Sequence, residues 1–322
     1  MKLELNDVTD RGYDLNRPEC VLCLASGDLF VSHKGAGVMH IAPNGGQHLI
    51  GTTQDVGGHE LVPNGIALLP DGAFLIANIG EAGGVWRLSR DGVISPYLLE
   101  VDGEKLAAAN FVMNDEQGRI WITVSTRKQP RFLAYSSEVA DGFVVLVDVH
   151  GARVVADGCV FANELRLSAD GKQLYLSETF GRRISRFSVR GTGSLGARQD
   201  FANFGYGTFP DGIAFDEDGY LWVTSIVSNR LIRVAPNGSR EVVLEDSVAE
   251  HVDAVEKALA EGRMSREHFY TMKSRKLCNI ASIAFGGRDR RTIYLGSLTG
   301  TTLATLHSPV PGRIPVHWDY RL

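Results

Sequence analysis

The sequence predicts an all-β protein, a six-bladed β-propeller with a short helical insertion before the last blade. Two observations carry this prediction: short apolar runs are joined by tight turns of the Asp-Gly type, and these turns recur at a regular interval. The intervals are 45, 46, 53 and 48 residues, and the turn glycines are Gly27, Gly72, Gly118, Gly171 and Gly219. A repeat of this length, made of strand, hairpin, strand and turn, is typical of propeller blades.

The sixth repeat is "IASIAFGGRDRRTIYLGS", residues 280–297, and it follows an insertion at about residues 246–275. Within the insertion, apolar side chains recur at helical spacing, and they are Val248, Val252, Val255 and Leu259. We expect a helix there, acting either as a lid on a pocket or as a packing or oligomer contact. Rossmann and TIM-type folds need long helices between strands throughout the chain, and only this stretch offers one. We therefore expect a single propeller domain over residues 1–322.

The chain ends are expected to close the ring, because propellers commonly use a terminal strand for this purpose. The C-terminal run "TTLATLHSPVPGRIPVHWDYRL", residues 301–322, is the expected closing strand of the last blade. The N-terminal segment 2–7 is expected to lie near it.

Composition excludes several functional classes. Hydrophobic residues make up 44% and charged residues 22% of the 322, and the formal net charge is −5 with no block of Lys or Arg. Nucleic acids and anionic membranes bind to basic surfaces, so neither is an expected partner. No window has the pattern of a signal peptide or the length of a membrane span. The sequence therefore favours a cytoplasmic protein with a small-molecule substrate, and it leaves the oligomeric state open.

The cysteines do not indicate a zinc site. Cys20 and Cys23 form a CxxC, but no second CxxC exists, and residues three apart on a strand point to opposite faces. Together with Cys159 and Cys278 they are expected to be small core residues of a reduced protein.

One position in each repeat carries an acid or an amide. It lies eight residues before the turn glycine, and the residues there are Glu19, Asn64, Asn110, Asn163 and Asp211. The first strand of every propeller blade lines the channel, so these side chains are expected to form a ring at one mouth of the channel. The alternative is that Asx residues favour strand starts and turns through local hydrogen bonds, and that alternative suits Asn64 in "PNG". The sixth blade offers Asn279 or Ala281 and is expected to contribute no charge.

Such a ring suits a hard divalent cation. Carboxylate and amide oxygens are the ligands of Ca²⁺, Mg²⁺ or Mn²⁺. Two facing carboxylates, Glu19 and Asp211, repel each other unless one takes up a proton, and a metal ion removes that conflict.

The segments "RPECVLCL", "ANFVMNDEQGRIW", "FANELRLSADGKQLYLSET" and "FPDGIAFDEDGYLWV" resemble the gluconolactonase / regucalcin (senescence marker protein) / luciferin-regenerating-enzyme family, and the resemblance runs through the whole chain. It implies a propeller that opens sugar lactones with one divalent metal ion, Ca²⁺ first, and Mg²⁺, Mn²⁺, Zn²⁺ or Fe²⁺ as alternatives. It also implies that Glu19, Asn163 and Asp211 hold the metal, that Asp211 is the catalytic general base, and that Asn110 contacts substrate or metal-bound water.

The chain departs from the family pattern beside these residues. Cys20 and Val21 stand where Gly-Pro is usual, Phe111 stands where Asp is usual, and Glu164 stands where Gly is usual. These differences concern the shape of the pocket more than the metal ligands.

The expected reaction is therefore hydrolysis of a sugar (aldono)lactone by water, with the carbonyl polarised by the metal. Two alternatives stay open: hydrolysis of a non-sugar lactone or other ester, and a non-catalytic propeller that binds a metal or ligand. No G-x-S-x-G motif indicates a serine nucleophile.

Residues at the ends of the second strands are candidates for binding substrate hydroxyls, since these strands return toward the same mouth. Six residues after the turn glycine lie His33, Asn78 and Ser225, and Glu178 lies one residue later in its blade. Arg127 follows the third blade's return strand. For each of them the alternative is ordinary hydrogen bonding within a loop, and for His33 this is preferred to a role as metal ligand.

Overall fold

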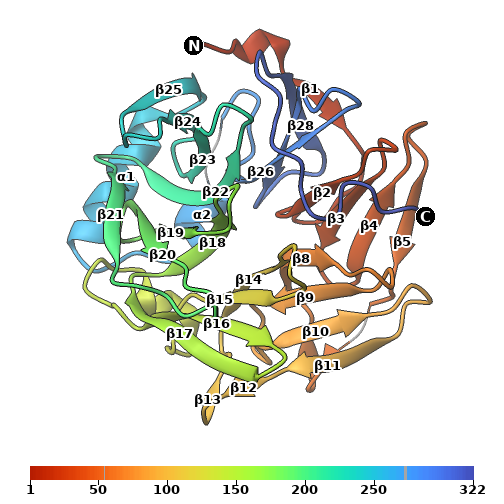
Figure 1. The fold of residues 1–322 in the computed structure, drawn as a ribbon. Helices are drawn as coiled ribbons and strands as arrows, with labels where there is room; N and C mark the ends of the chain where they lie inside the picture. The colour runs from red at the N-terminus through yellow and green to blue at the C-terminus, as the bar shows by residue number, and fades with distance from the viewer. Residues whose placement is uncertain (54, 272–273) are drawn as a thin grey trace.

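The computed structural model describes residues 1–53, 55–271 and 274–322, and these form six four-stranded antiparallel sheets in a closed ring (Figure 1). The predicted all-β, six-bladed propeller is thereby confirmed. In order from the channel outwards, the sheets are β2 (Val21–Cys23), β3 (Leu29–His33), β4 (Gly37–Ile41), β5 (Gln47–Ile50); β8 (Pro63–Leu68), β9 (Phe74–Asn78), β10 (Val85–Leu88), β11 (Ile94–Leu98); β14 (Ala109–Asn114), β15 (Ile120–Val124), β16 (Gly142–Asp148), β17 (Gly151–Cys159); β18 (Ala162–Leu167), β19 (Gln173–Glu178), β20 (Arg183–Ser188), β21 (Gln199–Asn203); β22 (Phe209–Phe215), β23 (Leu221–Ile226), β24 (Arg230–Val234), β25 (Arg240–Glu245); and β26 (Ile280–Gly286), β27 (Thr292–Ser297), β28 (Leu303–His307), β1 (Thr9–Arg11).

Short elements decorate the rims of the blades. They are the ladders β6 (Asp55–Val56) with β7 (His59–Glu60) and β12 (Glu100–Val101) with β13 (Glu104–Lys105), and the 3₁₀ turns Leu5–Asp7 and Arg131–Ala134.

The repeated glycines form the turn between the first and second strand of their blades. Each adopts a positive φ, between 67° and 90°, which only glycine adopts without a steric cost. The turns lie at one end of the channel, which we call the turn side. The residue eight positions earlier then lies at the opposite end of the channel, which we call the mouth.

A β-bulge recurs at the mouth end of the first strand. Five first strands lose register with their second strands there, between Pro63 and Ile66, Ala109 and Phe111, Ala162 and Leu165, Pro210 and Ile213, and Ile280 and Ser282. A bulge bends a strand and redirects a side chain. The bulges enclose Asn64, Asn110, Asn163 and Asp211.

The last blade is closed by the N-terminus. β1 pairs with β28, with Thr9 opposite Thr305 and Arg11 opposite Leu303. The expectation for the C-terminal run was therefore only partly right: it supplies β28, the third strand, whereas the outermost strand comes from the other end of the chain. The N-terminal strand also starts later than the segment 2–7, which forms a 3₁₀ turn at residues 5–7 instead.

The C-terminal tail beyond β28 crosses the turn side of the channel. Its backbone pairs with blade 5 at Gly312, which bridges to Asp216, and the Trp318 carbonyl accepts the amide of Ala25 in blade 1. Arg313 donates to the carbonyl of Leu167 in blade 4 at 2.8 Å. The tail thus ties several blades together on the side away from the mouth.

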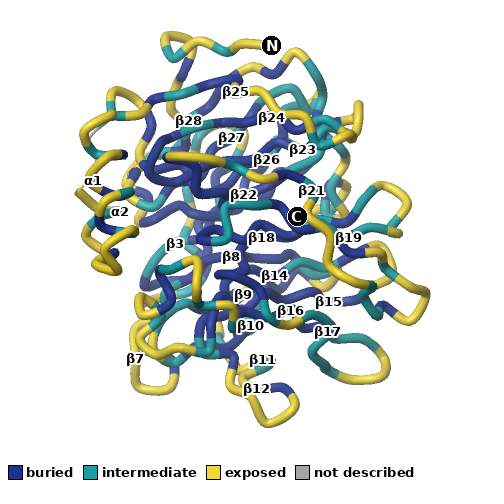
Figure 2. The backbone as a smooth tube through the Cα atoms, turned by 90° about the vertical axis from the view of Figure 1, so that its left-hand side faces the viewer, coloured by how far each residue is buried: buried dark blue, intermediate teal, exposed yellow. Residues whose placement is uncertain are grey.

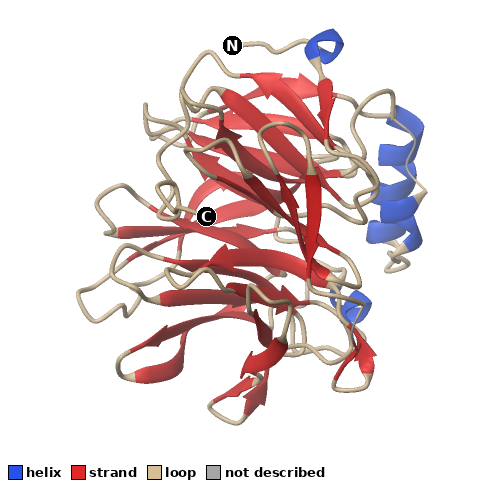
Figure 3. Ribbon diagram, turned by 90° about the vertical axis from the view of Figure 1, so that its right-hand side faces the viewer, coloured by secondary structure: helices blue, strands red, loops and turns tan. Residues whose placement is uncertain are grey.

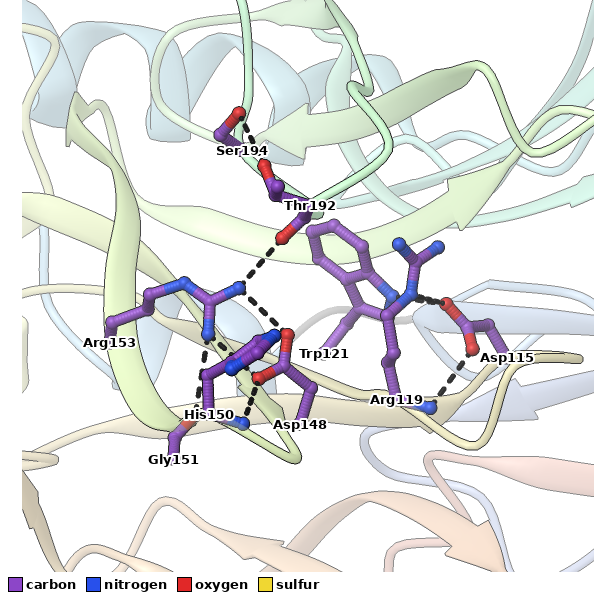
Figure 4. A network of polar contacts seen from close by, with 9 residues as sticks. All are labelled: Asp115, Arg119, Trp121, Asp148, His150, Gly151, Arg153, Thr192 and Ser194. Carbon is purple, nitrogen blue, oxygen red and sulfur yellow. Dashed lines mark hydrogen bonds and ion pairs between the residues drawn. The ribbon is translucent and has the colours of Figure 1, made fainter.

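The core lies between the blades, and its inner strands are the most buried part of the backbone (Figure 2). Fully buried Trp121 donates its indole N–H to Asp115 at 2.9 Å, and Arg119 binds the same carboxylate at 2.6 Å. Nearby, an Arg153–Asp148 ion pair extends to the carbonyl of Thr192 at 2.8 Å, which connects blade 3 to blade 4 (Figure 4). Burial of Trp121, Asp115 and Arg119 is tolerated because their polar groups bind one another.

The insertion forms α1 (Ala249–Ala260) and α2 (Glu267–Tyr270), which confirms the predicted helix before the last blade. Both helices lie on one face of the propeller (Figure 3). Val252 and Val255 of α1 pack in a cluster with Phe209 and Phe269, and Glu256 binds Arg182 at 2.5 Å. Among the described residues, no helix has the length and apolarity required to cross a membrane.

Candidate active site

The five ring residues meet at the mouth of the channel. All are buried, with exposed fractions of 2–4%, although all are polar: Glu19, Asn64, Asn110, Asn163 and Asp211. Polar side chains buried this far require partners, so their hydrogen bonds reveal their roles.

Asn64 acts as a spacer in the ring. Its side-chain oxygen accepts a hydrogen bond from Arg17 at 2.8 Å, and its amide nitrogen donates to the Glu19 carboxylate at 2.8 Å and to the Asn110 side-chain oxygen at 3.2 Å. Asn64 therefore holds Glu19 and Asn110 in place, and the local structural interpretation of this residue was too narrow.

Among the residues that the structure describes, two oxygen atoms of the ring have no hydrogen-bond partner. The Asn163 amide nitrogen donates to Thr179 Oγ1 at 3.1 Å, which leaves its Oδ1 buried and unpaired. Asp211 Oδ1 is likewise buried without a hydrogen-bond donor. Leaving a buried acceptor unsatisfied costs about 1–3 kcal/mol, and more for a charged group. Two such oxygens from neighbouring blades fit a bound cation.

The electrostatics of the ring agree with this interpretation. Burial raises the pKa of Glu19, with the guanidiniums of Arg17 and Arg131 acting in the opposite direction. Burial, and then the carboxylates of Glu19 and Glu164, hold the pKa of Asp211 well above its usual range. Like charges in a low-dielectric site are unfavourable, and a cation among them relieves the repulsion.

Glu164, the residue beside Asn163 that departs from the family pattern, is also buried at the ring. It accepts a hydrogen bond from the Ile213 amide at 3.2 Å and pairs with Arg166 at 2.9 Å. Burial raises the pKa of Glu164 to about 7, although Arg166 lowers it.

The donor set selects for hard metal ions. Over the described part of the chain, His, Cys, Asp and Glu side chains do not gather in groups of three or more that could hold a metal. The ring instead combines two carboxylates with amide oxygens, which is the chemistry of Ca²⁺ or Mg²⁺ sites. Glu19, Asn163 and Asp211 therefore fit the metal implied by the resemblance.

A cavity of about 400 Å³ opens beside the ring. The residues that form its walls include Arg17, Arg131, Tyr135, Arg266, Phe269 and Tyr270, the last three contributed by the insertion. A volume in this range accommodates a small ligand. The insertion thus forms one wall of the candidate pocket.

A second cavity, about 270 Å³, lies at the turn side of the channel beneath the C-terminal tail. Residues such as Val112, Phe215 and His317 line it. The five ring residues appear in the walls of neither cavity, but Arg17, which lines the first one, donates to Asn64 of the ring. We place the chemistry at the mouth because the unpaired oxygens are there.

The candidate substrate-binding residues have different surroundings. Asn110 lies in the ring and donates to Ser125 Oγ at 2.9 Å. Asn78 uses its side chain for the backbone of Val62, Gly80 and Gly83. The structure thus connects Asn110 to Glu19 through Asn64, and the side chain of Asn78 is bonded to a neighbouring loop.

Glu178, Ser225 and Arg127 are also bonded within their own blades. Glu178 accepts from the Val160 amide at 2.6 Å and pairs with Arg183, and Ser225 accepts from the Phe209 amide at 2.9 Å. Arg127 binds both carboxylate oxygens of Asp157, at 2.9 and 3.0 Å.

His33 ends β3 half-buried, and its Nδ1 is buried and has no hydrogen-bond partner in the described part of the chain. Among the described residues that line the cavity beside the ring, none of these five candidates appears: His33, Asn78, Arg127, Glu178 and Ser225.

The sequence interpretation missed the cationic and aromatic walls. Arg17 lies two residues before Glu19 but at no repeated position, and Arg131 lies in the long connection between β15 and β16. Phe269 lies in the insertion. None of these residues shares the phase of the repeat, so the signal that identified the ring could not identify them.

Comparison with known proteins agrees with this architecture. A 6-deoxy-6-sulfogluconolactonase from Pseudomonas putida is 28% identical over 234 residues, which cover 71% of this chain and 67% of that protein. A gluconolactonase structure from Xanthomonas campestris superposes with a TM-score of 0.67 at 20% identity, covering 94% of this chain and 88% of that one. Regucalcin from Agrobacterium tumefaciens, a calcium-binding protein, superposes with a TM-score of 0.64 at 17% identity, covering 97% and 94%. These two superpositions show the shared fold.

The sequence profile that describes the SMP-30/Gluconolactonase/LRE-like region matches residues 17–252, a span that includes Glu19, Asn64, Asn110, Asn163 and Asp211. The resemblance in the sequence is confirmed, and the chain belongs to the SMP-30/gluconolactonase/LRE-like family.

Proposed function

We propose that the protein is a divalent-metal-dependent lactonase that opens a sugar (aldono)lactone. The observation that carries this proposal is the pair of buried, unpaired oxygens, Asn163 Oδ1 and Asp211 Oδ1, in a ring that also holds Glu19. Family membership supports lactone hydrolysis. Among the relatives, the Pseudomonas putida protein is named as a sulfogluconolactonase and the Xanthomonas campestris protein as a gluconolactonase.

Glu19, Asn163 and Asp211 would hold the ion, with Ca²⁺ as the first candidate. The chemistry that a divalent ion supplies in such a ring is polarisation of the lactone carbonyl. Asn64 fixes the orientation of Glu19 through its 2.8 Å hydrogen bond, so the ligand set is preorganised.

The protein's own groups would perform the proton transfer. Asp211 is the proposed general base: with its Oδ1 directed to the ion, its second carboxylate oxygen would accept a proton from the attacking water. Asn110, fixed by Ser125, is the proposed contact to substrate or water on the adjacent blade. Tyr135 and Phe269 stack edge-to-face at 5.3 Å in the wall and exclude bulk water from one side of the pocket.

The test is acid release from a panel of aldonolactones, measured with a pH indicator after chelation and again with Ca²⁺, Mg²⁺, Mn²⁺ or Zn²⁺ restored. We expect turnover to vanish on chelation and to return with one of the ions. Asp211→Asn should lower kcat by about 100-fold or more, the usual contribution of a general base. Turnover that survives complete removal of divalent ions would contradict the proposal.

A non-sugar lactone or other carboxylic ester is the second candidate substrate. The aromatic walls favour it, because Tyr135, Phe269 and Tyr270 present apolar surface to the ligand. Aromatic lactones and esters in the same assay test this candidate. Stoichiometric metal binding without turnover of any compound would indicate a binding propeller.

A further inference from the structure

The cavity beside the ring has an excess of positive charge. Its walls carry Arg17, Lys34, Arg131 and Arg266 against two carboxylates, Glu60 and Glu81. Lys34 pairs with Glu60 at 3.5 Å, and Glu81 pairs with His59 at 3.1 Å. In the described part of the chain, the three arginines have no carboxylate within 4.0 Å of their guanidinium nitrogens, since Arg17, Arg131 and Arg266 take part in none of its ion pairs.

Within the described residues, two of these guanidiniums also have a buried N–H donor without an acceptor. Arg17 is only 6% exposed, and its terminal nitrogens donate to the Pro63 carbonyl at 3.1 Å and to Asn64, but its Nε has no acceptor. Arg131 lies over the ring of Phe161 at 5.7 Å, and its buried Nη1 has no acceptor. A buried guanidinium always carries its charge and its five N–H donors, so unused donors cost free energy until an acceptor arrives.

The charge balance changes when a cation occupies the ring. Without one, the guanidiniums of Arg17 and Arg131 interact electrostatically with the carboxylates of Glu19 and Asp211. A divalent ion held by Glu19 and Asp211 offsets those two charges. Arg17 and Arg131 are then left with two positive charges in the wall of a partly enclosed pocket, where an anion binds more strongly than in water.

We propose that the substrate is an anionic lactone: it carries a carboxylate, sulfonate or phosphate away from the lactone carbonyl, and Arg17 and Arg131 bind that group. This inference rests on the proposed function, because it assumes the lactone carbonyl is directed to the ring. Guanidinium groups match the geometry of all three oxyanions, and charge-assisted hydrogen bonds are the strong ones. Arg17 and Arg131 thus determine specificity, and the ring performs the reaction.

The experiment measures binding and does not require turnover. Four open-chain six-carbon acids serve as inert probes in isothermal titration calorimetry, with and without Ca²⁺: gluconate, which has no second anion, and its carbon-6 carboxylate (glucarate), 6-phosphate and 6-sulfonate counterparts. We expect at least one of the last three to bind the Ca²⁺-loaded protein about 10- to 100-fold more tightly than gluconate does. The preferred probe identifies which oxyanion the pocket selects.

Metal and anion binding should also be linked. If the ion releases Arg17 and Arg131 from the ring carboxylates, the anionic probe should bind more weakly without Ca²⁺, and the probe should tighten Ca²⁺ binding by the same factor. The preference should weaken as salt is raised.

Arg131→Gln is the main variant, because Arg131 makes no ion pair within the described chain, whereas Arg17 also supports the Pro63 loop. We expect it to reduce the preference over gluconate about tenfold, and Arg131→Lys to restore part of it. Arg288→Gln changes the net charge equally at an exposed site in the turn between β26 and β27, and it should keep the wild-type preference.

Equal affinity for the four probes, no detectable binding of the three doubly anionic ones, or a preference unchanged in Arg131→Gln would each overturn the inference. Its failure differs from failure of the proposed function. Hydrolysis of uncharged lactones without any anion preference would leave the lactonase intact and remove the anionic substrate. A strong anion preference without hydrolysis of any lactone would keep the anion site and remove the lactonase.

Discussion

Replacing Asp211 by Asn should stabilise the metal-free protein, although it removes the proposed catalytic base. Asp211 is 3% exposed, its Oδ1 has no donor, and the carboxylates of Glu19 and Glu164 act on it. The isosteric amide removes a buried charge and supplies an N–H₂ that can donate to neighbouring oxygens. One unsatisfied buried acceptor costs about 1–3 kcal/mol, so we expect a gain of about that size.

In saturating Ca²⁺, Asp211→Asn should instead be less stable than the wild type. A ligand at 100 times its Kd stabilises the folded state by about 2.7 kcal/mol, and the variant should lose most of this contribution with its charged ligand. Urea unfolding in a chelator and in saturating Ca²⁺ gives both values. The variant should therefore unfold at a higher urea concentration than the wild type in the chelator, and at a lower one in Ca²⁺.

Asp216→Asn provides the matched control. Asp216 is as buried as Asp211, but its carboxylate accepts from Trp222 Nε1, Arg233 Nε and the Tyr220 amide, each at 2.9 Å. Removing its charge leaves buried Arg233 poorly compensated, and we expect a loss of about 3–5 kcal/mol in both conditions. If Asp211→Asn destabilised the metal-free protein as Asp216→Asn does, Asp211 would be a structural acid and the argument for the cation would fail.

Two further predictions concern the chain ends. Burial, with a contribution from Arg166, lowers the pKa of His317 to about 4, so between about pH 6.5 and 4 the unfolded state binds a proton that the folded state does not. The free energy of unfolding should therefore fall by about 1–3 kcal/mol as the pH drops through this window. His317→Gln should flatten the dependence of the urea midpoint on pH. An unchanged pH profile in that variant would show that other groups control acid stability. Deleting residues 1–11 removes β1 and its pairing with β28, and it should cost about 3–5 kcal/mol in the same unfolding assay, whereas deleting residues 1–2 should cost less than about 1 kcal/mol. Equal stability of the two truncations would mean that β28 closes the ring without β1.

Much of the architecture is visible in the sequence because blades repeat. A strand alternates its faces with a period of two, and a glycine turn sets where the next strand starts, so equal spacing from Gly72 or Gly219 places Asn64 and Asp211 at equal heights in the channel. Even the surrounding bulges follow this phase. The helix at 249–260 was visible for the same kind of reason, since its apolar residues recur with the period of an α-helix.

The walls of the pocket and the closure of the ring were decided by the tertiary structure. Arg131 and Phe269 reach the pocket from a long connection and from an insertion, and such segments have no period that relates sequence distance to position in space. The last blade takes its outer strand from the N-terminus because the two chain ends meet there, some 300 residues apart in the sequence, with Thr9 opposite Thr305. The sequence by itself thus determined the propeller and the five oxygen-bearing residues of its ring, which a local repeat encodes. Only the folded ring brought Arg17 and Arg131 beside them, because that proximity depends on contacts between segments that no repeat relates.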